Sequence, residues 1–77
     1  MSATTDFVYT GEYITLGQFL KAVNIAQSGG EAKDLLLSGA VMVNRETETR
    51  RGRKLRHNDN VAIGRSTWLL ISSALQL

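Results

Sequence analysis

Residues 28–44 read SGGEAKDLLLSGAVMVN, and this segment determines the expected fold. Ser28 is a typical helix N-cap, and Glu31 three positions later completes the pattern of a capping box. The apolar positions that follow fall on one side of a helix, and they are Ala32, Leu35 and Leu36. Gly39 ends this helix, because glycine adopts the left-handed conformation without a steric penalty. We therefore predict a helix over residues 29–38.

Beyond this helix the hydrophobic period changes to two, which is typical of a β-strand. Val41 and Val43 fall on one face of that strand. Asn44–Arg45 is expected to form a turn, because asparagine tolerates a positive φ angle. Residues 46–49 are then expected to return as a second short strand.

An earlier helix is expected over residues 16–23. Its apolar stripe consists of Leu16, Phe19, Leu20 and Val23. Thr15 and Gln18 form a second capping box at its start. Residues 24–27 make a short connection in which we expect the side chain of Ile25 to be buried. Two short helices with a tight connection resemble a helix-turn-helix pair.

Three further segments have the composition of strands: residues 7–10, 61–63 and 68–71. The side chain of Leu55 is expected to be buried in the core. The order of strand, two helices and several short strands predicts an α+β fold, with the two helices packed on a small, twisted, mostly antiparallel sheet. One core is expected to contain Leu20, Leu35 and Val43.

A chain of 77 residues is long enough for one domain. We expect a flexible leader over residues 1–6, the domain over residues 7–71, and a C-terminal tail over residues 72–77 whose conformation the sequence does not determine. Cysteine is absent and there is one histidine, so neither a thiolate nor a multi-histidine metal site is expected, and no cofactor is predicted. With no export signal and no long apolar run, we expect a cytoplasmic protein without membrane contact.

The positive charge is concentrated in residues 45–56, which contain six basic and two acidic residues and so carry a net charge of +4. The whole chain carries only +2. A segment this basic is typical either of a site for a polyanion or of a solvated turn that aids solubility. Taken alone, the charge does not decide between the two.

The combined pattern resembles the S-four-type RNA-binding domain, also called the αL motif. The resemblance extends over residues 13–63, and the segments that carry it are 28–33, 35–36, 39–44, 53–55 and 59–61. It implies two helices on a small twisted sheet and the binding of structured RNA, often ribosomal RNA, with the ribosome or its assembly factors as further candidate partners. Where many relatives have an arginine between two serines, this chain has Gly29 and Gly30, and a second basic position is Asp34. We expect the basic segment to compensate for this loss.

Ten residues are therefore candidates for RNA contact: Ser28, Gly29, Gly30, Lys33, Asn44, Arg45, Arg50, Arg51, Arg53 and Lys54. Main-chain N–H groups at a helix start can bind a phosphate, and arginine forks pair with phosphates or stack on bases. Close packing is the structural alternative for the two glycines. We expect Lys21 to face solvent, and Tyr13 and Trp68 to pack in the core or at an edge rather than stack on bases.

No catalytic motif is present: the sequence has no Walker-type glycine loop and no nucleophile elbow. His57 is expected to be a surface residue, and no small-molecule substrate is expected. The sequence thus predicts non-catalytic binding of structured RNA through phosphate contacts. The alternative is a protein-interaction module that uses a Val41/Trp68 sheet edge or an exposed Leu37. DNA binding is disfavoured, because the helix over residues 29–38 offers only one basic residue.

Overall fold

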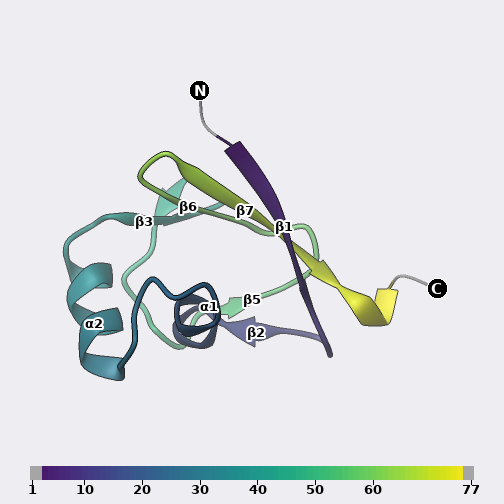
Figure 1. The fold of residues 1–77 in the computed structure, drawn as a ribbon, viewed down its shortest axis with the longest axis horizontal. Helices are drawn as coiled ribbons and strands as arrows, with labels where there is room; N and C mark the ends of the chain where they lie inside the picture. The colour runs from purple at the N-terminus through teal and green to yellow at the C-terminus, as the bar shows by residue number, and fades with distance from the viewer. Residues whose placement is uncertain (1–2, 76–77) are drawn as a thin grey trace.

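The computed structural model describes residues 3–75 and shows one helix lying against a sheet, with a second helix beside it at the end of the sheet (Figure 1). The predicted α+β fold is confirmed. In chain order, the elements are β1 (Ala3–Tyr9), β2 (Ile14–Thr15), α1 (Leu16–Ala22), α2 (Gly29–Leu37), β3 (Val41–Val43), β4 (Glu46–Thr47), β5 (Lys54–Leu55), β6 (Asn60–Ile63), β7 (Ser66–Ser72) and the 3-10 helix η1 (Ser73–Leu75).

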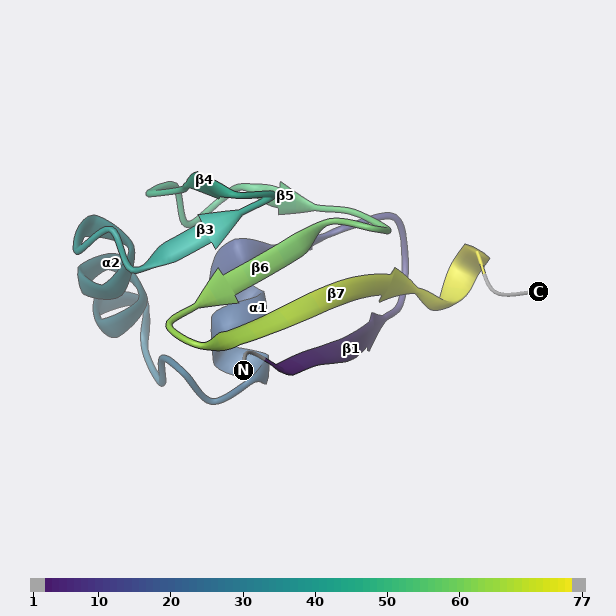
Figure 2. The same ribbon diagram turned by 90° about the horizontal axis from the view of Figure 1, so that it is seen from above.

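The main sheet has five strands in the order β1-β7-β6-β3-β4 (Figure 2). β1 pairs with β7 in parallel, and the other neighbours in this sheet are antiparallel. β2 and β5 form a separate two-stranded antiparallel sheet. The sheet is therefore mostly antiparallel, as predicted.

The core lies between α1, α2 and the inner face of the main sheet. Phe19 of α1 is fully buried, and its ring makes edge-to-face contacts with Phe7 and Trp68 at centroid distances of 5.0 and 5.5 Å. The other fully buried large side chains include Leu16, Leu20, Leu36, Val41, Val43, Leu55, Val61 and Leu70. The expected burial of Leu20 and Val43 is confirmed. Leu35 is only partly buried, because Leu36 is the residue of α2 that faces the core.

Both helices begin at the predicted N-caps. Thr15 and Gln18 form the full capping box: Thr15 Oγ1 accepts from Gln18 N at 3.2 Å, and Gln18 Oε1 accepts from Thr15 N at 3.0 Å. At α2, Ser28 Oγ accepts from Glu31 N at 3.2 Å, which is one of the two bonds of a capping box. Each helix ends one residue earlier than predicted, and Gly39 has the expected positive φ of 81°.

The connection between the helices differs from the expectation. Ile25 is 39% exposed, whereas Ala26 is buried at 1%. Asn24 adopts a φ of 61°, and the N–H groups of Ile25 and Ala26 both donate to Leu20 O, at 3.0 and 3.2 Å. This turn directs Ala26 into the core in place of Ile25.

The β3–β4 hairpin has the two-residue turn predicted at Asn44–Arg45. Both residues have positive φ angles, 50° and 72°, as in the type I′ turn that suits the twist of a hairpin. The returning strand is shorter than expected and ends at Thr47.

The ends of the domain lie further out than predicted. β1 begins at Ala3, so most of the predicted leader is a strand: residues 3–6 pair with residues 66–69 of β7. This extension was missed because residues 4–6 are exposed and polar and so show no apolar alternation. At the other end, Ser72 is buried in β7 and residues 73–75 form η1. Residues 1–2 and 76–77 of the predicted leader and tail lie outside the described part.

Candidate nucleic-acid interface

Glu48 neutralises part of the basic segment. Arg50 donates to its carboxylate from Nε at 3.1 Å and from Nη2 at 3.0 Å, and Arg53 donates from Nη1 at 2.8 Å. Glu48 is only 7% exposed, so its charge is held among these guanidinium groups. Of the predicted contact residues, Arg50 and Arg53 are therefore already engaged within the protein.

The same carboxylate also shapes the loop. Glu48 Oε2 accepts from the main-chain N–H groups of Thr49 and Arg50, at 3.0 and 3.1 Å. Hydrogen bonding to Arg50 is the largest of the effects that lower the pKa of Glu48 to about 2, and it outweighs the opposing effect of burial. In the sequence, Glu48 is evident only as an acidic residue that reduces the net charge of residues 45–56. Its position just ahead of an arginine cluster was the signal available.

The loop that carries Arg51 is attached to the start of α1. Leu16 N donates to Arg53 O at 2.8 Å, and Gly17 N donates to Arg51 O at 2.9 Å. These bonds satisfy main-chain donors that the first turn of a helix leaves free. The backbone of residues 51–53 is thereby fixed on α1.

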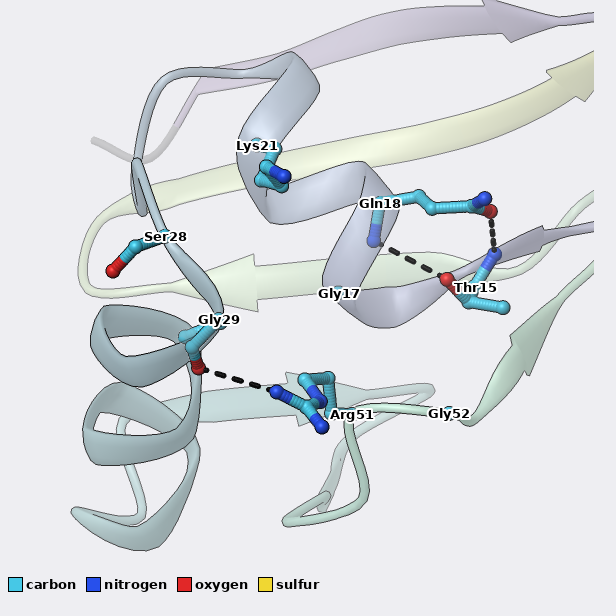
Figure 3. A pocket seen from close by; sticks show the side chains of 9 residues that line it. Thr15, Gly17, Gln18, Lys21, Ser28, Gly29, Arg51 and Gly52 are labelled. Carbon is cyan, nitrogen blue, oxygen red and sulfur yellow. Dashed lines mark hydrogen bonds between the residues drawn. The ribbon is translucent and has the colours of Figure 1, made fainter.

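Arg51 extends from this loop toward the start of α2, where its Nη1 lies 3.5 Å from Gly29 O (Figure 3). A groove of about 310 Å³ lies between α1, the start of α2 and the Arg51 loop. Its walls are formed by Thr15, Gly17, Gln18, Lys21, Ser28, Gly29, Ala32, Arg51 and Gly52. The lining contains two cationic side chains and no carboxylate.

The groove brings together only some of the predicted contact residues, namely Ser28, Gly29 and Arg51. Gly30 lies in the first turn of α2 without lining the groove. Lys33 is exposed further along α2 and is also outside the lining. Lys54 is exposed on β5, which pairs with β2 beside the groove.

Asn44 and Arg45 lie elsewhere. The Asn44 side chain bridges to the start of β6, where Nδ2 donates to Asp59 Oδ1 and Oδ1 accepts from Asn60 N, both at 3.0 Å. Arg45 lines a second hollow of about 380 Å³. Apart from Arg45, that hollow is lined by Thr4, Met42, Asn60, Ala62, Thr67 and Leu69, and it shares no residue with the groove.

Lys21 is exposed to solvent, as expected, and it also lines the groove opposite Arg51 (Figure 3). The helical period contained the signal for this position, because residues four apart lie on one face of a helix. Lys21 therefore shares a face with Gly17, against which the Arg51 loop rests.

Tyr13 was expected to pack in the core or at an edge, but it is 42% exposed. Two cations lie over its ring: Lys54 Nζ is 4.9 Å and Arg56 Cζ is 5.6 Å from the centroid. Trp68 packs against Phe19, as expected. His57 is not a free surface residue, because its Nδ1 accepts from Ser72 N at 3.0 Å and so holds the end of β7.

Within residues 3–75, no three His, Asp or Glu side chains gather closely enough to hold a metal ion. In the same part of the chain, no helix is both long enough and apolar enough to cross a membrane.

Comparisons with known proteins match nearly the whole domain. The family model described as the S4 domain matches residues 7–70. A protein of Bacillus subtilis (strain 168) described as "probable ribosome maturation protein RlbA" is 56% identical over 52 residues, which cover 68% of this chain and 73% of that protein. No solved structure matches.

Proposed function

The chain belongs to the S4 domain family, and on that basis we propose that it binds structured RNA through phosphate contacts without catalysing a reaction. The description of its Bacillus relative as a probable ribosome maturation protein supports ribosomal RNA as the target and ribosome assembly as the setting. Assembly takes place in the cytoplasm, where we expect this protein to act.

The groove at the Arg51 loop is the observation that carries the proposal. Two cations line it, no carboxylate lies in its walls, and the start of α2 forms one side. A volume of about 310 Å³ is at the lower end for ligand clefts, so the groove suits a single phosphodiester unit of a longer chain. Recognition would then depend on the path of the RNA backbone, which is how proteins mostly recognise folded RNA.

Each wall of the groove has a distinct part in this binding. The Arg51 guanidinium offers a planar fork of donors that matches phosphate oxygens. Lys21 adds a compact positive charge from α1. Gly29 has no side chain to keep a phosphate away from the backbone at the start of α2.

The remaining predicted cations surround the groove. Arg50 keeps 71% of its side chain exposed although it is paired with Glu48, so donors remain free for a further phosphate. Arg53 is less exposed and serves mainly to hold the loop through Glu48. Lys33 and Lys54 extend the basic surface, whereas Asn44 contributes by fixing the hairpin turn.

A protein-interaction module is the second candidate, and the exposure of Leu37 at 63% favours it. The other surface expected for this role is lost, since Val41 is fully buried and Trp68 packs on Phe19. The two candidates differ in how they depend on salt.

The test is a fluorescence titration of the protein with fragments of structured ribosomal RNA at several salt concentrations. With three to five phosphate contacts, the slope of log K against log salt is expected to be about −2 to −4. An affinity that does not change with salt would contradict phosphate binding and favour the protein-interaction module.

A further inference from the structure

The outward face of the two-stranded β2–β5 sheet carries an aromatic ring beside two cations. Ile14 pairs with Leu55, which is fully buried, and Thr15 pairs with Lys54. Because side chains alternate along a strand, Thr15 and Lys54 lie on the face turned away from the core. Tyr13 and Arg56 continue the two strands on this same face, in agreement with the positions of Lys54 and Arg56 over the Tyr13 ring.

The positive charge on this face is not neutralised by ion pairs. In residues 3–75, the ion pairs join Glu48 to Arg50 and Arg53, and none involves Lys54 or Arg56. Asp59 contacts the main-chain N–H of Arg56 at 2.7 Å rather than its guanidinium group. The exposed ring is therefore flanked by two cations that are available to a ligand.

This face is continuous with the groove at the Arg51 loop. Thr15 lines the groove and is also the strand partner of Lys54. Figure 1 shows β2 and β5 side by side next to α1. A chain that places one phosphate in the groove can thus continue across Lys54 to Tyr13.

We propose that Tyr13 stacks on an unpaired base of the RNA, while Lys54 and Arg56 bind the phosphates that flank this base. The proposal rests on the proposed function and adds a contact with a base to a site otherwise built for phosphates. An aromatic side chain stacked on a base typically changes affinity by about 5- to 150-fold. An exposed contact between a cation and a ring accounts for only about 2- to 5-fold, so a base can displace a cation from the ring.

Two synthetic RNAs test the proposal. One is a short hairpin with a single-stranded tail of four nucleotides, and the other is the same hairpin with a tail of abasic ribose units, which keeps every phosphate. The parent protein is expected to bind the intact tail about 5- to 150-fold more tightly than the abasic one. Tyr13→Phe keeps the ring and should keep this ratio.

Tyr13→Leu is the matched variant, because it keeps an apolar side chain of substantial size but removes the ring. It should bind both RNAs with nearly equal affinity, and its melting temperature should stay near that of the parent. Arg51→Ala should weaken binding to both RNAs by the same factor and leave the ratio unchanged.

The outcomes separate the stacking contact from RNA binding itself. Equal affinity of the parent for the two tails, with the expected dependence on salt, would overturn the stacking proposal and leave phosphate binding intact. A Tyr13→Leu variant that keeps the full preference would likewise remove Tyr13 from the site. Failure of the parent to bind either RNA at low salt would overturn the proposed function as well.

Discussion

Gly17 and Arg51 are in direct contact: a Cβ atom placed on Gly17 would lie 2.6 Å from Arg51 Cγ. Arg51 O accepts from Gly17 N at 2.9 Å on the same side of α1. The stem of Arg51 is therefore held against the first turn of the helix. The position of its guanidinium group in the groove depends on the absence of a side chain at residue 17.

Gly17→Ala should weaken RNA binding. The Cγ atom of Arg51 is close to its own backbone, so the added methyl group must move the loop and not only the end of the side chain. We expect the free energy of unfolding to fall by about 1–3 kcal/mol, the usual cost of overpacking. Titration with ribosomal RNA fragments and thermal melting measure the two effects.

Gly30→Ala is the matched control in α2. A Cβ atom there would meet only Ser28 Oγ, at 3.9 Å, so there is room for it. This change should raise the free energy of unfolding by up to about 1 kcal/mol, through the better helix propensity of alanine, and should leave binding unchanged. If Gly17→Ala and Gly30→Ala bind RNA with the same affinity, the contact between Gly17 and Arg51 does not contribute to binding.

Lys21→Ala should weaken RNA binding and reduce the magnitude of the salt slope by about one, because one phosphate contact is lost. Arg45→Ala removes the same charge from the second hollow, on the sheet face turned away from the helices, and should have a smaller effect. Measurement of both variants at the same salt concentrations separates a contact in the groove from a general effect of net charge. A larger effect of Arg45→Ala would indicate that RNA binds the opposite face of the sheet.

Glu48→Gln should lower the free energy of unfolding at neutral pH. The folded carboxyl group has a pKa of about 2 against an ordinary value of 4.5, so folding favours its charged form. We expect a loss of about 1–2 kcal/mol, since solvent weakens the part of the network formed by the exposed Arg50.

The pH dependence of stability gives a second measure of the same network. As the pH falls through 4.5 toward 2, the unfolded chain takes up a proton at residue 48 before the folded chain does, and the stabilisation by Glu48 is lost. The free energy of unfolding, measured by urea denaturation, should therefore fall less between neutral pH and about pH 3 for Glu48→Gln than for the parent. An equal fall in the two proteins would show that Glu48 does not contribute to the pH dependence of stability.

Leu36→Ala should lower the free energy of unfolding by about 2–5 kcal/mol, because Leu36 is fully buried and its loss leaves a cavity. Leu37→Ala should have little effect, since that side chain is 63% exposed. Thermal melting of these two variants tests directly which face of α2 is turned toward the core. Similar melting temperatures would show that the helix face is misassigned.

The parts of the fold that follow from local signals could be predicted from the sequence. The helix starts at Thr15 and Ser28 and the turn at Asn44 depend on residues within a few positions of each other, and each appears in the structure. The first half of β1 could not be predicted, because its pairing with β7 uses main-chain groups and leaves polar side chains exposed. Where an edge strand has polar, exposed side chains, its pairing with a distant segment gives no hydrophobic period in the sequence.

The candidate site was also predictable only in part. The sequence identified Arg51 by its charge, but the pairing of Arg50 and Arg53 with Glu48 depends on how an irregular loop folds. Lys21 joins Arg51 only when that loop lies across α1. Charge and spacing therefore indicated a basic surface but not which of its cations are available.

The parallel pairing of β1 with β7 has a consequence for the order in which the domain folds. Each residue of β1 pairs with the residue 63 positions later, as Ala3 does with Ser66 and Tyr9 with Ser72. Ribosomes synthesise the chain from its N-terminus, so β1 emerges first and has no partner until β7 has been made. Contacts between such distant segments form slowly, whereas the helices and the β3–β4 hairpin form from neighbouring residues. The sheet is thus completed only when translation of the domain is nearly finished, and a nascent chain that stops before β7 exposes an unpaired strand at its N-terminal end.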